Sequence, residues 1–234
     1  IRLSRARPEV FRTQIRAMLR AAAHYSALRG SNGCPNLRIM FPMISNPKEF
    51  TWAKVQIKSV REELEKEDPK MKIPRDIKTG AMIEVPGLAF NVDYLRPRAD
   101  FLSIGTNDLI QYLFAVDRTN ERVSDLYNPA TKAVFSLLKH IRQQLVSQEG
   151  RGHIPEISIC GEMASDHVQV LMLMGLGYRY FSVSVPMVPL VKYVLRKVSY
   201  SECSRITLNG MERATMNVDL DAMRKYLDNQ LTTH

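Results

Sequence analysis

The sequence has few cysteines, and their arrangement excludes a cross-linked or zinc-binding scaffold. Its 234 residues include three cysteines, Cys34, Cys160 and Cys203, which lie far apart and form no Cys-x-x-Cys pair. Disulfide frameworks and structural zinc sites both need several cysteines at short, regular spacings. Any cysteine chemistry in this protein must therefore come from a single thiol.

Long apolar segments are also missing. No window approaches 18 consecutive apolar residues, which is about the length that a membrane-spanning helix needs. The first five residues, Ile1-Arg2-Leu3-Ser4-Arg5, have neither the apolar stretch nor the cleavage site of a signal peptide. These absences predict a cytoplasmic protein with no membrane partner.

Clusters of basic residues are missing too, although the chain carries a formal net charge of +9. The lysines and arginines are scattered, and no stretch combines them with interleaved aromatic residues, as nucleic-acid-binding surfaces do. We therefore expect no nucleic-acid partner. An anionic small substrate or an acidic protein partner accounts for the positive charge more simply.

What the sequence does contain is a regular alternation of strand-like and helix-like segments. Short apolar runs bounded by turn residues predict five strands, and segments with helical periodicity lie between them. The strands are expected at 37–41, 81–85, 101–104, 157–160 and 180–184, and the helices at 8–25, 47–67, 130–148, 167–174 and 189–198. Strands that are apolar along their whole length are typical of a parallel sheet that helices cover.

Two α/β architectures fit this alternation, an open doubly wound sheet and a (β/α)₈ barrel of the TIM type. Polar residues follow four of the five strands, namely Glu84, then Asn107 and Asp108, then Cys160 and Glu162, and finally Ser182 and Ser184. A ring of polar residues at one edge favours the barrel, because its loops converge at the carboxyl ends of the strands.

Five strands do not close an eight-stranded barrel, so either the sheet is open or the chain is the later part of a longer one. The chain enters a helix signal at Pro8 and Glu9 without a preceding strand, which favours the second option. We predict a partial barrel of about five β/α units that lacks the first strands, in residues 1–206. Residues 207–234 are expected to form a helical extension that packs on it.

Two carboxylates at the predicted edge suggest a metal site. Taken alone, Glu84 fits a strand-end ion pair and Asp108 fits a helix N-cap. Together they end successive parallel strands, so their side chains are expected within a few ångströms of each other. Mg²⁺ is commonly held by one or two carboxylates, with the remaining positions left to water and substrate phosphate. The sequence therefore predicts a magnesium site formed by Glu84 and Asp108.

Arg118 and Cys160 are candidates for substrate chemistry at the same edge. Arg118 lies one short helix beyond Asp108, and its planar guanidinium suits phosphate or carboxylate, although a salt bridge to Asp117 or Glu121 is an alternative. Cys160 ends a strand and is followed by a glycine, so it is either an inert small side chain or a reactive thiol. A nearby divalent cation and arginine would lower the pKa of that thiol, which could then exchange a proton with a carbanion.

The segments that carry these residues resemble a known family. They are similar to the C-terminal, phosphoenolpyruvate-binding half of enzyme I of the bacterial phosphotransferase system, and most similar to its nitrogen-related branch. The matching segments are 1–4, 8–20, 37–44, 82–86, 101–108 with Arg118, and 158–164, within roughly residues 1–198. Their order and spacing make the resemblance very specific.

The resemblance implies a phosphoenolpyruvate-binding (β/α)₈ barrel that forms a homodimer. By the same match, Glu84 and Asp108 hold Mg²⁺, and phosphoenolpyruvate contacts Asn107, Asp108 and Arg118. Cys160 would supply the proton that turns enolpyruvate into pyruvate. These roles agree with the charge that a phosphoryl group develops as it leaves.

In the family, the phosphoryl group passes to a histidine of a separate N-terminal domain, and then to a histidine-containing phosphocarrier protein that serves sugar transport. That histidine and two further phosphate-binding arginines precede the region that this chain resembles, so we expect the chain to be inactive by itself. Two other interpretations remain open. One is a fragment of pyruvate phosphate dikinase or phosphoenolpyruvate synthase, and the other is a non-catalytic dimerisation module.

Overall fold

The structure is a computed structural model that describes residues 1–29, 37–146 and 154–232. Cys34 lies outside the described residues, as do residues 147 and 148 of the helix expected at 130–148. Within the described part, every one of the five predicted strands is present. They are β1 (Arg38–Phe41), β2 (Lys78–Ile83), β3 (Phe101–Gly105), β4 (Glu156–Cys160) and β5 (Tyr180–Ser182).

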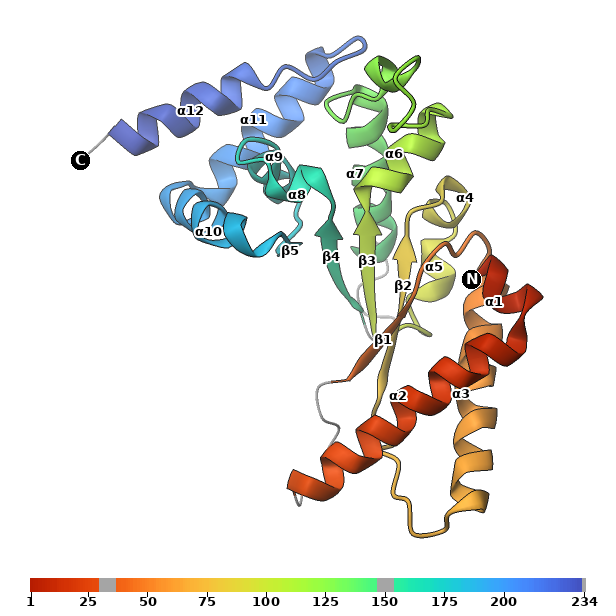
Figure 1. Cartoon of the computed structure of the whole chain (residues 1–234). Coiled ribbons are helices and arrows are strands. Elements are labelled where there is room, and N and C mark those ends of the chain that lie inside the picture. Colours follow the sequence, from red (N-terminus) through yellow and green to blue (C-terminus); the bar gives the residue numbers. More distant parts are fainter. Residues whose placement is uncertain (30–36, 147–153, 233–234) are drawn as a thin grey trace.

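The five strands form one parallel sheet in the order β1-β2-β3-β4-β5 (Figure 1). Each strand therefore pairs with the next one along the chain, and a helical connection leads from each to the next. A doubly wound sheet reverses its strand order at a switch point, whereas successive strands of a β/α barrel stay neighbours. The architecture is that of a partial barrel of five β/α units, as the sequence predicts.

The helices that precede, connect and follow these strands vary widely in length. The longer ones have a periodic apolar face, which allowed most of them to be predicted. They are α2 (Pro8–Arg29), α3 (Pro47–Glu67), α6 (Thr106–Phe114), α7 (Lys132–Val146), α10 (Val188–Lys197), α11 (Tyr200–Arg213) and α12 (Asp221–Thr232). The short ones are α1 (Arg2–Ala6), α4 (Pro86–Ala89), α5 (Val92–Leu95), α8 (Glu162–Ser165) and α9 (Gln169–Gly175), with single 3₁₀ turns η1 (Ser124–Leu126) and η2 (Val185–Met187).

The two faces of the sheet differ in burial. One face is covered from β1 to β4, and its neighbouring residues Ile83, Ile104 and Ile159 are 0% exposed. On the other face, Met82 and Ser158 are partly exposed. Because successive side chains of a strand point to opposite faces, this difference fixes which residues face the core. The parallel direction of the strands brings their carboxyl ends to one edge.

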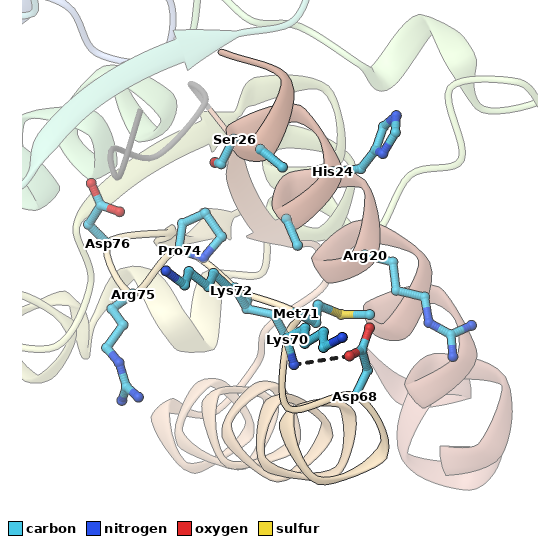
Figure 2. Close-up of a pocket in the computed structure, with 13 residues that line it drawn as sticks. Arg20, His24, Ser26, Asp68, Lys70, Met71, Lys72, Pro74, Arg75 and Asp76 are labelled. Atoms are coloured by element: carbon cyan, nitrogen blue, oxygen red, sulfur yellow. Dashed lines mark hydrogen bonds between the residues drawn. The ribbon is translucent and has the colours of Figure 1, made fainter. Parts of the chain in front are cut away.

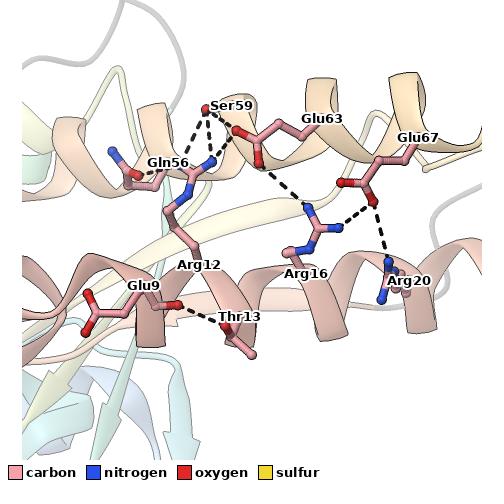
Figure 3. Close-up of polar contacts among 9 residues, drawn as sticks. All are labelled: Glu9, Arg12, Thr13, Arg16, Arg20, Gln56, Ser59, Glu63 and Glu67. Atoms are coloured by element: carbon pink, nitrogen blue, oxygen red, sulfur yellow. Dashed lines mark hydrogen bonds and ion pairs between the residues drawn. The ribbon is translucent and has the colours of Figure 1, made fainter.

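Ion pairs join α2 to α3 along their length (Figure 3). Arg12 contacts Glu63, and Arg16 lies between Glu63, at 3.7 Å, and Glu67, at 2.5 Å. Arg20 reaches the same Glu67 carboxylate at 3.6 Å. The three arginines are spaced four residues apart, so they lie on the face of α2 that meets the glutamates of α3. Much of the positive charge of α2 is therefore used within the fold.

The first half of helix α11 was not predicted from the sequence, whereas residues 207–213 fall in the expected helical extension. The helix packs against α9 so closely that a Cβ added to Gly175 would lie 2.4 Å from Thr207 Oγ1. Thr207 Oγ1 also donates a hydrogen bond to the Met172 carbonyl oxygen at 3.3 Å. The expected boundary between residues 206 and 207 lies inside this helix, and the division into two parts stays a prediction.

The C-terminal helix α12 docks on the rest of the protein through one face, as its apolar spacing suggests. Met223 and Leu227 are buried, at 0% and 2% exposure, and Leu220 and Leu231 are partly buried against the same core. Among the described residues, we find no helix with the length and apolar character needed to cross a membrane.

Candidate functional site

The polar residues predicted from the sequence meet at the carboxyl ends of β2, β3 and β4, which we call the carboxyl edge. Ile83 of β2 pairs with Ile104 of β3, and Gly105 of β3 pairs with Cys160 of β4. Glu84, one residue past the end of β2, is therefore level with Gly105 and with Cys160. The strand register alone thus brings the carboxyl group and the thiol to the same height in the sheet.

Glu84 is buried, with 3% of its surface exposed, beneath the loop that follows β1. Its Oε1 atom accepts a hydrogen bond from the backbone N–H of Met43 at 2.6 Å. Met43 has a φ of 56°, in the left-handed region that non-glycine residues seldom occupy. On the other side, a Cβ added to Gly105 would lie 2.9 Å from Glu84 Oε2. The strained backbone of Met43 and the missing side chain of Gly105 therefore both accommodate the Glu84 carboxyl group.

Asp108 lies beside Glu84, in the first turn of α6. Burial raises the pKa of the Glu84 carboxyl above its usual value, and the charge of Asp108 and a hydrogen bond with it add to this effect. The alternative role of Asp108 as a helix N-cap is not observed, because the N-cap of α6 is Gly105 and has no side-chain cap. The structure thus places two acidic groups side by side, an arrangement that a cation between them would relieve.

These two groups fit a hard cation such as Mg²⁺. Carboxylate oxygens are its preferred protein ligands, and it commonly keeps several positions for water and substrate phosphate. Within the described parts of the chain, we find no cluster of three or more His, Cys, Asp and Glu side chains arranged to hold a metal ion. The protein would then supply two ligands, Glu84 and Asp108, and leave the others open.

Cys160 lies at the end of β4 with its thiol toward β3. Its Sγ donates to the Ile104 carbonyl oxygen at 3.3 Å, and Ser103 Oγ is 3.5 Å from the same sulfur. Burial raises the pKa of the Cys160 thiol, and the charges of Glu84 and Asp108 raise it further. This direction applies to the protein without a cation, and the lowering expected beside a divalent cation stays a prediction. A thiol with a raised pKa keeps its proton at neutral pH, as a proton donor must.

The turn after Cys160 is locked against the start of α6. Gly161 has a φ of 101°, and a Cβ there would lie 2.3 Å from Thr106 Oγ1 and 2.8 Å from Asn107 Oδ1. Thr106 Oγ1 donates to the Cys160 carbonyl oxygen at 2.8 Å. Asn107 Oδ1 accepts from the backbone N–H of Glu162 at 3.0 Å. The amide oxygen of Asn107 is thus used within the fold, which leaves its NH₂ group to donate to an anion.

Arg118 lies in the loop after α6, where its backbone N–H donates to Gln111 Oε1 at 3.2 Å. Its guanidinium forms an ion pair with Glu162, with Nη1 3.5 Å from Oε1. The acidic partner of this arginine thus comes from the loop after β4. The salt bridge to Asp117 or Glu121 weighed from the sequence is not among the ion pairs of the described residues.

Tyr127 also reaches this group of side chains. Burial raises the pKa of the Tyr127 hydroxyl, and the neighbouring Glu162 and Asp108 act in the same direction. Arg118 opposes them through its charge and a side-chain hydrogen bond. Sequence reasoning missed the contacts of Tyr127, Ser103 and Met43 at this edge. The glycines at 105 and 161 were the only local signal that backbones approach closely there.

A separate cleft of about 730 Å³ lies at the opposite edge of the sheet (Figure 2). It is formed by the second half of α2 and the connection between α3 and β2, near the amino ends of the strands. The basic residues Arg20, Lys70, Lys72 and Arg75 line it together with Asp68 and Asp76. The carboxyl-edge residues do not line this cleft.

Comparison with known proteins places this arrangement among enzymes that use phosphoenolpyruvate. Residues 1–200 match the family described as "PEP-utilising enzyme, PEP-binding domain". The chain is 35% identical over 227 residues to a phosphoenolpyruvate-protein phosphotransferase of Buchnera aphidicola, and 36% identical over 229 residues to that of Staphylococcus carnosus. It is 37% identical over 216 residues to a protein of Escherichia coli named for the phosphoenolpyruvate-dependent phosphotransferase system.

These alignments cover most of this chain but only part of each relative. They include 97%, 98% and 91% of the chain, and 37%, 37% and 26% of the three relatives. A solved structure, a citrate lyase of Burkholderia xenovorans, superposes with a TM-score of 0.50 over 94% of this chain and 67% of its own. At 17% identity this likeness concerns the fold alone, and it agrees with the partial barrel.

Proposed function

Because this chain belongs to the phosphoenolpyruvate-binding domain family of phosphoenolpyruvate-utilising enzymes, we propose that its carboxyl edge binds phosphoenolpyruvate together with Mg²⁺. The observation that supports this most directly is the pair of adjacent carboxyl groups, Glu84 and Asp108, with Cys160 level with them in the sheet. Acidic side chains next to one another are poorly suited to an anionic substrate by themselves. If they held a divalent cation, they would form a site for phosphate.

Each further residue has a role that its position supports. The NH₂ group of Asn107 and the guanidinium of Arg118 would bind the phosphate and hold it against the strand ends. When bound, Mg²⁺ would neutralise charge on the phosphoryl oxygens. The buried Ser103 hydroxyl and the Ile104 carbonyl orient the thiol of Cys160.

The proposed reaction is phosphoryl transfer to a protein histidine. The bond between phosphorus and the enol oxygen breaks, and a bond between phosphorus and a histidine nitrogen of another domain forms. The electron pair left on the enolate takes a proton from Cys160 Sγ at the methylene carbon, which gives pyruvate. The thiolate then regains a proton from water. The thiol has to be protonated at the start of this cycle, in agreement with its raised pKa.

The partners of this reaction follow from the family and are likewise proposals. The acceptor would be a histidine outside this chain, which passes the phosphoryl group to a histidine-containing phosphocarrier protein. A homodimer, a cytoplasmic location and membership of the nitrogen-related branch are hypotheses of the same standing. Light scattering of the purified protein would test the dimer, and phosphate transfer to candidate carriers would test the branch.

The experiment that tests the proposed function measures binding and turnover of phosphoenolpyruvate with and without Mg²⁺ in the full-length protein. We expect Glu84→Gln and Asp108→Asn each to abolish the Mg²⁺-dependent turnover. Asp93→Asn, which removes a carboxylate from the exposed surface of α5, is the matched control and should leave turnover unchanged. Normal turnover in either site variant would refute the metal assignment. A full-length protein without Mg²⁺-dependent binding would favour a non-catalytic dimerisation module.

A further inference from the structure

The ion pair between Arg118 and Glu162 links the loops that follow β3 and β4. The two groups approach to 3.5 Å, and their side chains differ in exposure, with 32% for Arg118 and 75% for Glu162. The arginine is thus partly enclosed at the carboxyl edge, whereas the carboxylate reaches it from the solvent side. Such exposed pairs contribute little to stability and separate easily.

Both members of the pair are held by their backbones rather than by each other. The backbone N–H of Glu162 donates to Asn107, and the close fit of Gly161 against Thr106 fixes the start of α8. The backbone N–H of Arg118 donates to Gln111 at 3.2 Å. These backbone contacts do not depend on the ion pair, so the two side chains can separate and exchange partners while the backbones stay in place. Stability does not explain why an acidic side chain lies against this arginine.

We propose that the Glu162 carboxylate is an internal substitute for the substrate anion. It occupies the guanidinium of Arg118 in the substrate-free protein, and the phosphate of the substrate displaces it on binding. This inference rests on the proposed function, which assigns Arg118 to phosphoenolpyruvate. A phosphate dianion can accept two parallel hydrogen bonds from a guanidinium, whereas the 3.5 Å approach of Glu162 is a loose contact that a phosphate readily replaces.

The displacement of the Glu162 carboxylate by the substrate has a measurable consequence for the affinity for phosphoenolpyruvate. Because the substrate must compete with Glu162, removing the carboxylate should make phosphoenolpyruvate bind more tightly. If Glu162 instead held Arg118 in its productive position, removing it would weaken binding. The two roles therefore predict changes of opposite sign.

The test is calorimetric titration of phosphoenolpyruvate in the presence of Mg²⁺, with the full-length protein. We expect Glu162→Gln to lower the Kd by about two- to fivefold, which is the range of an exposed ion pair. Glu121→Gln is the matched control. It removes the same charge three residues from Arg118, at an exposed position that forms no ion pair among the described residues, and should leave the Kd unchanged. An unchanged or higher Kd for Glu162→Gln overturns the proposal.

A second pair of variants tests whether the effect passes through Arg118. In an Arg118→Gln background, phosphoenolpyruvate binds more weakly, and adding Glu162→Gln should no longer change the Kd. A persistent gain in that background would mean that Glu162 acts by general repulsion, and would overturn the exchange. The wild-type titration distinguishes a failure of the proposed function from a failure of the inference about Glu162. If the wild type shows no Mg²⁺-dependent binding, the proposed function fails; if it binds but Glu162→Gln gains nothing, only the substitution by Glu162 fails.

Discussion

At the scale of single residues, Gly161 links a strained backbone conformation to the candidate site. Its φ of 101° lies in the region that favours glycine, and it has no space for a side chain beside Thr106 and Asn107. The turn that it makes carries Cys160 on one side and Glu162 on the other. A larger residue would therefore move groups at the site as well as strain the backbone.

We predict that Gly161→Ala lowers the free energy of unfolding by about 1–3 kcal/mol, through backbone strain and the forced displacement of Asn107. Urea denaturation measures this change. The control is Gly210→Ala in α11, where a Cβ would lie 3.4 Å from Val218 Cγ1, an ordinary contact. Because glycine disfavours a helix, the control should gain about 0.5–1 kcal/mol. Equal stabilities for the two variants would show that the turn tolerates a side chain.

Cys160 allows substrate binding and proton transfer to be separated. We predict that Cys160→Ala in the full-length protein binds phosphoenolpyruvate with nearly the wild-type Kd, because the proposed phosphate contacts, Asn107 and Arg118, lie elsewhere. The rate of pyruvate formation should fall by about 10²–10⁴, the usual contribution of a positioned proton donor. Rapid-quench measurement of pyruvate tests this. An unchanged rate would assign the proton to another group.

At the scale of elements, the start of α3 is stabilised by a reciprocal cap. Asn46 Oδ1 accepts from the Lys48 backbone N–H, and Glu49 Oε2 accepts from the backbone N–H groups of Ser45 and Asn46 at 2.8 and 3.1 Å. Arg5 adds an ion pair to Glu49 at 3.3 Å. Burial would raise the pKa of the Glu49 carboxyl, but these hydrogen bonds outweigh it and hold the pKa below its ordinary value of 4.5.

The cap predicts a pH dependence of stability. Because the folded-state pKa of Glu49 is depressed, its contribution is fully present above about pH 4.5 and is lost as the pH falls through the lower folded-state value. Glu49→Gln should therefore lower the free energy of unfolding at pH 7 by about 1–3 kcal/mol and lessen the loss of stability between roughly pH 5 and pH 3. Urea denaturation across that range is the measurement. Glu62→Gln, on the exposed side of the same helix, should follow the wild-type curve.

The long elements could be predicted from the sequence because burial imposes a period on them. The strand at 101–104 reads as apolar since helices cover it, and the helix at 47–67 ends at the predicted residue. The start of helix α11 at Tyr200 escaped prediction because its buried face includes Cys203 and Thr207, which interrupt the pattern of large apolar residues. Short helices such as α8 (Glu162–Ser165) contain too few residues to show any period.

The candidate site likewise has a part that could be predicted from the sequence and a part that could not. The meeting of Glu84, Asp108 and Cys160 follows from parallel strands, whose carboxyl ends all lie at one edge, so it could be expected before the structure. The pairing of Arg118 with Glu162 depends on how two loops fold over the sheet. No local pattern in the chain encodes that distance.

At the scale of the whole molecule, the C-terminal residues are tied into the barrel at two places. Helix α11 fits against α9 at Gly175, where Thr207 leaves no room for a side chain. Beyond it, the backbone of Val218 donates to the Ala130 carbonyl oxygen at 2.8 Å, and that of Lys132 to Met216 at 2.8 Å. These bonds connect the segment before α12 to the loop that leads into α7. Whether the chain divides at residue 206 therefore depends on whether the parts on either side of that residue unfold together.

Two truncated chains test whether the parts on either side of residue 206 unfold together. A chain that ends at Arg213 keeps α11 whole and loses α12, whose buried Met223 and Leu227 each contribute about 1.5–3 kcal/mol. We expect this chain to unfold cooperatively but at lower urea. A chain that ends at Ile206 loses Thr207 and the second half of α11, uncovers α9, and should not unfold cooperatively at all. If the shorter chain instead unfolds as sharply as the longer one, the barrel does not need α11, and residue 206 is its boundary.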